Sequence, residues 1–290
     1  MKEPPFALRD ATVAVVGLGL MGGSLARALR AQNACRKILG ITRNAASRQA
    51  ALSSAIVDAA SADLALAAEA DVIIMATPVR TILEQLPQVG AIAREGAIIM
   101  DLGSTKLEIT HAMEGLPAHI EPIGAHPMCG KETFGFDAAD ADLYRNAVFV
   151  LTPLARTLPA TLAFAESLAV TLGARPVVLD PARHDRIVAA ISHLPFALAA
   201  TLMTTADELA RADDLLYGLA ASGFRDTSRL AAGDTTMMLD ILLTNHEDVA
   251  VALRTYGQHL DELAELIDRQ DETALRAILQ DAAMKRRQLF

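Results

Sequence analysis

The sequence predicts a two-part α/β protein, in which a doubly wound, mostly parallel sheet is followed by an all-helical domain. Two patterns support this. Residues 11–180 alternate continuous β-branched runs with helical stretches, as expected for strands that are buried on both faces of a parallel sheet. After Pro181 no convincing strand is found, and apolar residues recur at helical spacing. A chain of 290 residues can form two cores, and we place the domains at 1–180 and 181–290.

The strands of the first domain are expected at short runs rich in Val, Ile and Ala. These runs are Thr12–Val16, Ile38–Ile41, Asp71–Ala76, Ala97–Asp101, Ile120–Ala125, Ala147–Leu151 and Arg175–Leu179. Helical stretches lie between them, for example Arg80–Val89 and Pro159–Leu172. Alternation of this kind predicts βαβ units and therefore a layered α/β domain.

A glycine-rich turn follows the first expected strand. Gly17, Gly19 and Gly22 have the spacing G-x-G-x-x-G and are followed by a helical stretch. Glycines at these points permit a tight turn, close approach of the backbone to a pyrophosphate, and close packing of helix on strand. The helix N-terminus then offers free N–H groups to phosphates. This is the fingerprint of a Rossmann-type domain, and we expect dinucleotide contacts from Gly17, Gly19, Leu20, Met21 and Gly22.

The end of the second expected strand favours NADP over NAD. An acidic residue at this point binds the ribose 2′-hydroxyl of NAD, whereas arginine accommodates the 2′-phosphate of NADP. Here the strand is followed by Thr42, Arg43 and Asn44, with no Asp or Glu. Arg43 can pair with a phosphate and Thr42 can donate a hydroxyl hydrogen bond, with Arg48 about one turn away.

Three short stretches lie at the carboxyl ends of later strands, where ligands bind to open α/β sheets. Thr77 and Pro78 are expected beside the nicotinamide ribose, and Ser104 lies at the start of a helix. His126 lies at a strand end before a proline and is the best candidate for a general base. A solely structural role is the alternative for a single histidine. Lys131 and Glu132 are expected to contribute to a gate over this pocket.

The helical half contributes two polar segments and much apolar surface. Ser192 and His193 lie in one segment, with Pro195 expected to kink its helix. The segment 223–229 is doubly basic, and Arg225 in it could clamp a substrate carboxylate, unless it is a charged connection between helices. A stripe of apolar side chains over about five turns favours a homodimer. The stripe consists of Val249, Leu253, Tyr256, Leu260, Leu263 and Ile267.

Composition excludes several other classes of protein. A net charge of −9 argues against nucleic-acid binding, which needs clustered Lys and Arg. The longest uncharged apolar stretches, such as Leu194–Met203, are too short for a membrane span, and no secretion signal is expected at the N-terminus. The two cysteines, Cys35 and Cys129, give no disulfide framework and suit the cytoplasm. No cluster has metal-ligand spacing, so no metal is expected.

Five motifs in order resemble the prephenate/arogenate dehydrogenase family of tyrosine biosynthesis. They are the loop 17–24, the segments 101–106, 126–128 and 192–195, and the segment 223–227. The resemblance covers about residues 11–270 and implies a dimerisation domain. It implies oxidative decarboxylation of a cyclohexadienyl ring, with hydride transferred to NAD(P)⁺ and a proton accepted by His126. By the same resemblance Ser104 hydrogen-bonds the ring hydroxyl and Arg225 binds the ring carboxylate. His193 lines the site near the nicotinamide, and Ser192 and Thr227 are further candidates for substrate binding.

One position departs from the family pattern. Relatives that prefer prephenate often carry a second histidine three residues after the first, where this chain has Phe196. We therefore favour arogenate over prephenate as substrate, and a prephenate-preferring enzyme is the alternative. A β-hydroxyacid dehydrogenase is a second alternative, although no lysine lies between residues 184 and 206 to supply its site. A non-catalytic NADP-sensing module would need the glycine loop but not Ser104, His126 and Arg225 together.

Overall fold

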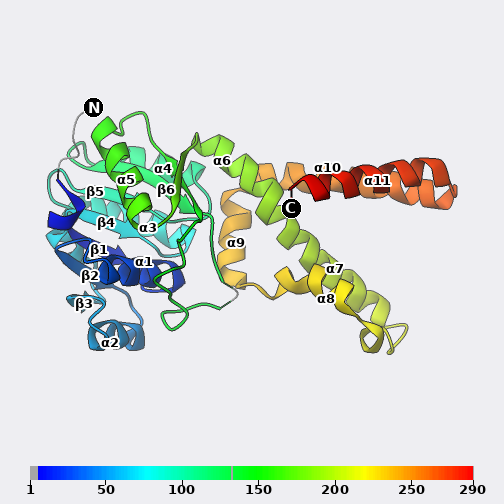
Figure 1. Ribbon diagram of the computed structural model, residues 1–290, viewed down its shortest axis with the longest axis horizontal. Coiled ribbons are helices and arrows are strands. Elements are labelled where there is room, and N and C mark those ends of the chain that lie inside the picture. The colour runs from blue at the N-terminus through cyan, green and yellow to red at the C-terminus, as the bar shows by residue number, and fades with distance from the viewer. Residues whose placement is uncertain (1–5, 132, 290) are drawn as a thin grey trace.

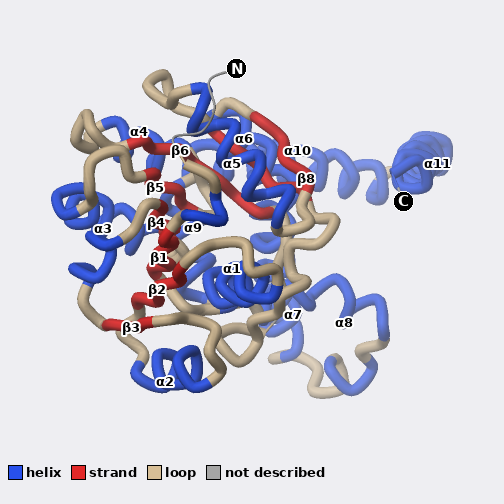
Figure 2. The backbone as a smooth tube through the Cα atoms, turned by 60° about the vertical axis from the view of Figure 1, so that its left-hand side comes forward, coloured by secondary structure: helices blue, strands red, loops and turns tan. Residues whose placement is uncertain are grey.

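The structure, a computed structural model, describes residues 6–131 and 133–289 and has the predicted fold class. Its centre is an eight-stranded sheet with the strand order β3-β2-β1-β4-β5-β6-β7-β8 (Figures 1 and 2). Neighbouring strands are parallel except β6 and β7, which are antiparallel. The strands are β1 Thr12–Val16, β2 Lys37–Ile41, β3 Ala59–Ser61, β4 Val72–Met75, β5 Ile98–Asp101, β6 Glu121–Pro127, β7 Val148–Thr152 and β8 Arg175–Val178.

Helices cover both faces of the sheet. Successive side chains of a strand point to opposite faces, so Val13 and Val15 of β1 join one buried cluster while Ala14 and Val16 join the other. The first cluster contains α1, α2 and α5, and the second contains α3 and α4. These helices are α1 Leu20–Ala31, α2 Ala45–Ser53, α3 Val79–Ile92, α4 Leu107–Glu114 and α5 Pro159–Thr171. Burial on both faces is the reason that the strands read as continuous apolar runs.

The expected strands are found, with two differences. The edge strand β3 was not expected, because its sequence Ala-Ala-Ser has no β-branched or aromatic residue. Strand β6 extends two residues past the expected end, to Pro127, because Pro127 lies opposite Phe149 of β7 in the antiparallel pair. His126 is therefore held inside a paired strand, opposite Val150, rather than in a loop after it.

From Pro181 onward, the described part of the chain consists of helices joined by turns and contains no strand. Its helices are α6 Pro181–Val188, a π-helical turn Ala189–His193, α7 Leu194–Ala210, α8 Ser222–Ser228, α9 Thr235–Thr244, α10 His246–Asp268 and α11 Glu272–Leu289. Short 3-10 turns are found at Leu8–Asp10, Leu64–Glu69, Tyr217–Leu219 and Arg229–Ala232. Figure 1 shows that α7 and the α10–α11 pair leave the sheet domain as two diverging arms.

A π-helical turn lies just before Pro195, the residue expected to kink this helix. The chain stays helical from Pro181 to Ala210, and the wide π turn lies directly before α7, in whose first turn the proline lies. A proline has no N–H to bond the carbonyl four residues earlier, and wider turns at such points relieve the clash with that carbonyl. The π turn also contains His193, so it lies at the expected site.

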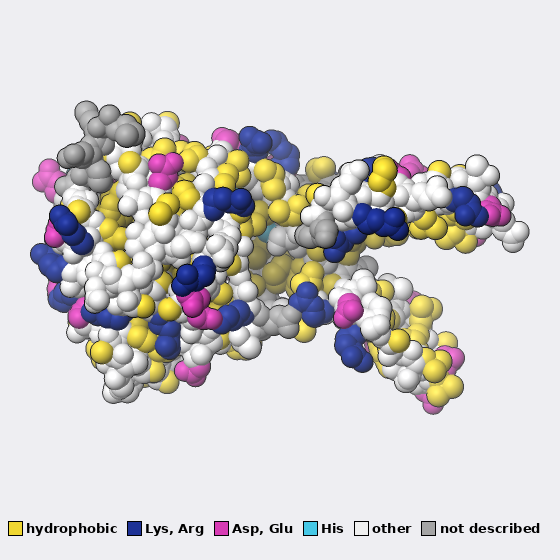
Figure 3. Space-filling view, viewed as in Figure 1, with side chains coloured by type: hydrophobic (Ala, Val, Ile, Leu, Met, Phe, Trp, Pro, Cys, Tyr) yellow, Lys and Arg dark blue, Asp and Glu magenta, His cyan; other side chains and the backbone are white. Residues whose placement is uncertain are grey.

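Both arms expose large apolar side chains, which Figure 3 shows on their surfaces. In α10, Leu260 is 49% and Ile267 55% exposed, and in α11 Leu279 is 64% exposed. The helical stretch Pro181–Ala210 is also long and apolar enough, by length and composition alone, to cross a membrane. Surfaces of this kind on helical arms are also what a second copy of the chain would cover.

Candidate active site

The glycine-rich loop joins β1 to α1 in a conformation that requires glycine. Gly17 has φ +101°, and a Cβ there would lie 2.6 Å from the carbonyl oxygen of Ala76. A Cβ on Gly22 would collide with the carbonyl oxygen of Gly17. At Gly19, in contrast, a Cβ would meet no atom within 4 Å among the described residues, so the space above this residue is open. The loop therefore has the closely packed base and the open cradle that a pyrophosphate needs.

A groove of about 630 Å³ runs from this loop along the carboxyl ends of the strands. It is lined by Gly17, Thr42, Arg43, Thr77 and Pro78, together with side chains of α3 and Thr236 of α9. The structure thus brings together five of the residues expected to bind the cofactor, from the ends of the three strands β1, β2 and β4. Leu20 and Met21 begin α1 beside them.

The segment after β2 is ordered by its own polar groups. The Asn44 side chain caps α2 by accepting a hydrogen bond from the Ser47 N–H at 3.0 Å. Arg48 does lie near Thr42, where its Nη1 donates to the Thr42 carbonyl oxygen at 2.6 Å. Arg43 is exposed on the wall of the groove.

His126 is only partly buried, and its ring is tied to the start of the helical domain. Its Nδ1 lies 2.9 Å from Nε2 of His184, and the two rings meet edge to face with centroids 5.1 Å apart. Nδ1 of His184 lies 2.7 Å from Oδ1 of Asp185. Both α6 residues are 1% exposed. Sequence reasoning missed this pair, although an adjacent His and Asp in the first turns of an apolar helix would have been a usable signal.

The Asp185 carboxylate in turn accepts hydrogen bonds from the N-terminus of α4. Lys106 N–H donates to Oδ1 at 2.7 Å and Leu107 N–H donates to Oδ2 at 2.8 Å. This is the favourable place for an anion, because a helix N-terminus has free N–H groups and a positive dipole end. Asn245 completes the cluster: its Nδ2 donates to the Asp185 carbonyl oxygen at 2.8 Å and lies 3.2 Å from Nδ1 of His193. His126 and His193 are therefore members of one polar cluster.

A buried ion pair stabilises the carboxyl ends of β5 and β6. Lys106 and Asp101 are both 0% exposed, and the Lys106 ammonium is bonded to the Asp101 carboxylate. It also donates to the Ala125 carbonyl oxygen at 2.7 Å, directly before His126. Asp101 accepts from the N–H groups of Gly103, at 2.7 Å, and Ala125, at 3.1 Å. The loop that carries Ser104, which is half-buried, is thus anchored on both sides.

The surroundings of His126 and His193 favour their neutral forms. Burial holds the pKa of His126 well below its ordinary value of 6.5, and the proximity of His184, Lys106 and His193 lowers that pKa further. Burial also lowers the pKa of His193 to about 4, against an opposing effect of Asp185. A neutral imidazole has a free lone pair, so His126 can accept a proton at neutral pH.

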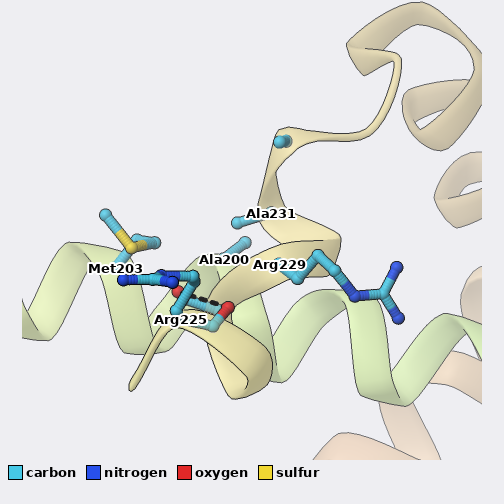
Figure 4. A pocket seen from close by; sticks show the side chains of 7 residues that line it. Ala200, Met203, Arg225, Arg229 and Ala231 are labelled. Atoms are coloured by element: carbon cyan, nitrogen blue, oxygen red, sulfur yellow. Dashed lines mark hydrogen bonds between the residues drawn. The ribbon is translucent and has the colours of Figure 1, made fainter. Parts of the chain in front are cut away.

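The remaining predicted residues lie elsewhere. Arg225 and Thr227 are exposed on α8, which packs on α7 along the outer arm in Figure 1, so one chain does not bring them to His126. Arg225 and Arg229 line a cavity of about 660 Å³, and Figure 4 shows their guanidinium groups pointing in opposite directions. Ser192 is exposed beside His193. Of the expected gate, Lys131 pairs with Asp140 at 2.8 Å, and Glu132 lies outside the described residues.

Comparisons with known proteins cover both halves of the chain. The family model described as the nucleotide-binding domain of prephenate dehydrogenase matches residues 25–178. The model described as the dimerization domain of prephenate dehydrogenase matches residues 180–281. Because the matches continue through the helical half, they favour the main interpretation over a hydroxyacid dehydrogenase or a nucleotide-sensing module.

Individual relatives agree. A prephenate dehydrogenase of Lactococcus lactis is 35% identical over 91% of this chain and 73% of its own length. A crystal structure of prephenate dehydrogenase from Aquifex aeolicus, in complex with hydroxyphenyl propionate and NAD⁺, has a TM-score of 0.92 and 30% identity, with all of both chains covered. Synechocystis arogenate dehydrogenase has a TM-score of 0.83 and 35% identity over 96% of this chain and 100% of its own. The chain is an NAD(P)-dependent oxidoreductase and belongs to the prephenate/arogenate dehydrogenase family.

Proposed function

We propose that this enzyme converts arogenate to tyrosine by oxidative decarboxylation, with NADP⁺ as its preferred oxidant. The proton of the ring 4-hydroxyl moves to His126, and the hydrogen on C4 leaves as hydride. The bond from the ring to its carboxylate breaks to release CO₂, and its electron pair completes the aromatic ring. The proton on His126 is then available to the phenolic oxygen. The neutral, partly buried His126 at the end of β6 is the observation that carries this proposal.

The neighbouring residues take supporting roles. Ser104 hydrogen-bonds the 4-hydroxyl, and its anchored loop supports that role because a fixed donor costs little ordering on binding. His193 lines the site near the nicotinamide, which is supported by its link to Asp185 through Asn245. Ser192 and Thr227 remain candidates for contacts with the rest of the substrate.

The experiment for the base is His126→Asn, which keeps polarity but cannot accept the proton. We expect kcat to fall about 10²- to 10⁴-fold, the usual contribution of a general base. The Kd for NADP should stay unchanged, because the glycine loop is untouched. His111→Asn is the matched control, since this histidine is 88% exposed. Near-normal kcat in His126→Asn would show that the proton goes elsewhere.

The cofactor is held by the loop residues Gly17, Gly19 and Gly22 and by the groove beyond them. Bound NADP⁺ supplies the hydride acceptor. Preference for the 2′-phosphate is supported by Arg43, whose guanidinium borders the groove where an NAD-binding enzyme carries an acidic residue.

The measurement is kcat/KM with each cofactor for the wild type and for Arg43→Gln. The variant should lose at least tenfold in kcat/KM for NADP and little for NAD, since only NADP carries the extra phosphate. The NAD rate is thus the internal control. A clear wild-type preference for NAD would refute the assignment.

Preference for arogenate rests on Phe196. Its ring packs beside Gly233, where an added Cβ would lie 3.5 Å from Cε2 of Phe196. An apolar ring here offers no hydrogen-bond donor to the keto group that distinguishes prephenate from the ammonium-bearing arogenate. Steady-state rates with both substrates test this. Good turnover of prephenate without detectable turnover of arogenate would overturn it, and Phe196→His should shift the ratio of kcat/KM toward prephenate.

The carboxylate clamp is assigned to the basic segment on α8, acting in a homodimer. Support comes from the exposed apolar arms and from the dimerization-domain match. Arg225→Ala should raise KM strongly with a smaller effect on kcat, because it removes a binding contact. Arg229→Ala, at the same cavity, tells whether the two arginines share this role. Sedimentation at micromolar concentration should give the mass of a dimer, and a monomer would contradict this part.

The proposed boundary lies at residue 180, between a cofactor-binding domain 1–180 and a helical domain 181–290, and the end of β8 at Val178 and the start of α6 at Pro181 support it. The cytoplasm is the proposed location. The free thiols of Cys35 and Cys129 are in keeping with a reducing compartment.

A further inference from the structure

We propose that His184 and Asp185 are positioning residues that hold the His126 ring with its proton on Nδ1, so that Nε2 is the atom that accepts the substrate proton. The inference rests on the proposed role of His126 as the base. It adds which nitrogen acts and what determines that choice. Neither α6 residue is needed for contact with the substrate.

The direction of the hydrogen bonds starts at Asp185. Its Oδ1 accepts the Lys106 N–H at 2.7 Å and its Oδ2 accepts the Leu107 N–H at 2.8 Å. Backbone N–H groups can only donate, so both oxygens must be acceptors. The carboxylate is therefore held as an acceptor by α4, whose register fixes these two amides.

The neighbouring rings must follow this direction. Nδ1 of His184, 2.7 Å from Oδ1 of Asp185, carries a proton and donates it to the carboxylate. In a neutral His184 the other nitrogen, Nε2, is then a bare acceptor. Nδ1 of His126, 2.9 Å away, must donate to it. This leaves Nε2 of His126 without a proton, which is the state that a general base requires.

The charges around His126 suit the same arrangement. The groups that face it are His184 of α6, His193 of the π turn, and Lys106 before α4 with its partner Asp101 of β5. Asp185 lies beyond His184. When His126 accepts a proton, the new positive charge is adjacent to the Lys106 ammonium and is opposed by it. The acceptor chain through His184 to the Asp185 carboxylate stabilises that charge, so it lowers the cost of protonation in the reaction.

Three variants separate this role from simple packing. His184→Leu removes the acceptor, and we expect kcat to fall roughly 10²-fold, within the range of general-base effects. His184→Gln keeps an acceptor oxygen on a side chain of similar reach, so it should recover at least tenfold over His184→Leu. Asp185→Asn places a donor amide against His184 or α4, and its kcat should be no higher than that of His184→Leu. KM and the Kd for NADP should change little in the two His184 variants.

The direct readout is nitrogen NMR of histidine-labelled, NADP-bound enzyme. In the wild type the His126 signal, assigned by its absence in His126→Asn, should show a protonated Nδ1 and a bare Nε2. In His184→Leu the proton should redistribute toward Nε2, and His111→Gln should leave the His126 signal unchanged. A purely structural role of His184 would not move this tautomer.

The outcomes are distinct. A wild-type His126 protonated on Nε2 overturns the proposal, as does wild-type kcat in folded His184→Leu. Equal loss in folded His184→Leu and His184→Gln also overturns it, because a retained acceptor should help. If His126→Asn is fully active, the proposed base itself fails. If His126→Asn is inactive while the His184 variants behave as wild type, only the positioning role fails.

Discussion

Lys106→Met should be strongly destabilising, because it leaves a carboxylate buried without its counter-charge. Lys106 and Asp101 are fully buried, and the ammonium also bonds the Ala125 carbonyl oxygen. Breaking a buried ion pair from one side costs about 3–5 kcal/mol. At about 2–4 °C per kcal/mol for a chain of this size, we expect the midpoint of thermal unfolding to fall by about 10 °C.

The assays are thermal and urea unfolding followed by circular dichroism at a fixed protein concentration, since the stability of a dimer depends on that concentration. The double variant Lys106→Met with Asp101→Asn is the matched control. It removes the uncompensated charge, so it should be more stable than Lys106→Met alone. A loss of less than about 1 kcal/mol in the free energy of unfolding of Lys106→Met would refute the reasoning. So would a double variant whose loss equals the sum of the losses in Lys106→Met and Asp101→Asn.

The sign of the pH dependence gives a second check. Burial raises the pKa of Asp101, and the Lys106 charge opposes that rise. Without the ammonium, the folded-state pKa lies further above the unfolded value, so stability is lost as pH rises through the folded pKa. Lys106→Met should therefore be more destabilised, relative to the wild type, at pH 8 than at pH 5. The same variant should move the acid limb of kcat/KM to higher pH, because Lys106 lowers the pKa of His126.

Three further predictions follow from other contacts. Gly22→Ala puts a Cβ against the Gly17 carbonyl oxygen and should weaken NADP binding at least tenfold by calorimetry, whereas Gly257→Ala should not, because a Cβ there meets none of the described atoms within 4 Å. Asp240→Ala removes the carboxylate that accepts the Arg80 N–H of α3 at 3.1 Å, and should cost about 1 kcal/mol of stability, as loss of a helix cap does; an unchanged unfolding midpoint would contradict this. The pKa of His193 is lowered to about 4, so the unfolded chain binds more protons than the folded chain between about pH 6.5 and 4. The free energy of unfolding should therefore decrease by up to about 3 kcal/mol as the pH falls from about 6.5 to about 4. His193→Asn should flatten that part of the curve.

The sequence predicted the sheet well because its signals are local. Runs such as Thr12–Val16 are buried on both faces and so stay apolar without interruption, and the glycines that follow leave little choice of turn. The edge strand β3 could not be predicted, because its three small residues carry no local signal for a strand. Its extended conformation is stabilised by parallel pairing with β2. The helical half was recognised from periodicity, which does not depend on distant partners.

The site was only partly predictable, because its chemistry depends on contacts between distant residues. His126 could be selected from its strand end, but its partner His184 is 58 residues away in the chain. Asp101 and Lys106 lie in a segment that the sequence identifies as a family motif, but their pairing and complete burial could not be predicted, because both are tertiary properties. Arg225 illustrates the opposite limit: its motif identifies a function, but one chain does not hold it beside the other site residues.

The π turn Ala189–His193 sets the rotational phase between the two halves of the long helix. Each residue of an α-helix turns the chain by about 100°, so the number of residues between His184 and α7 sets the directions in which the two surfaces face. His184 before this turn and His193 at its end face the site, while α7 and its apolar surface follow the turn. Deleting a single residue here would leave the composition of both surfaces intact and turn one away from the other. The relative orientation of the two halves therefore depends on the number of residues in this turn as well as on contacts. Insertions in this turn should be far less tolerated than insertions in the surface loops.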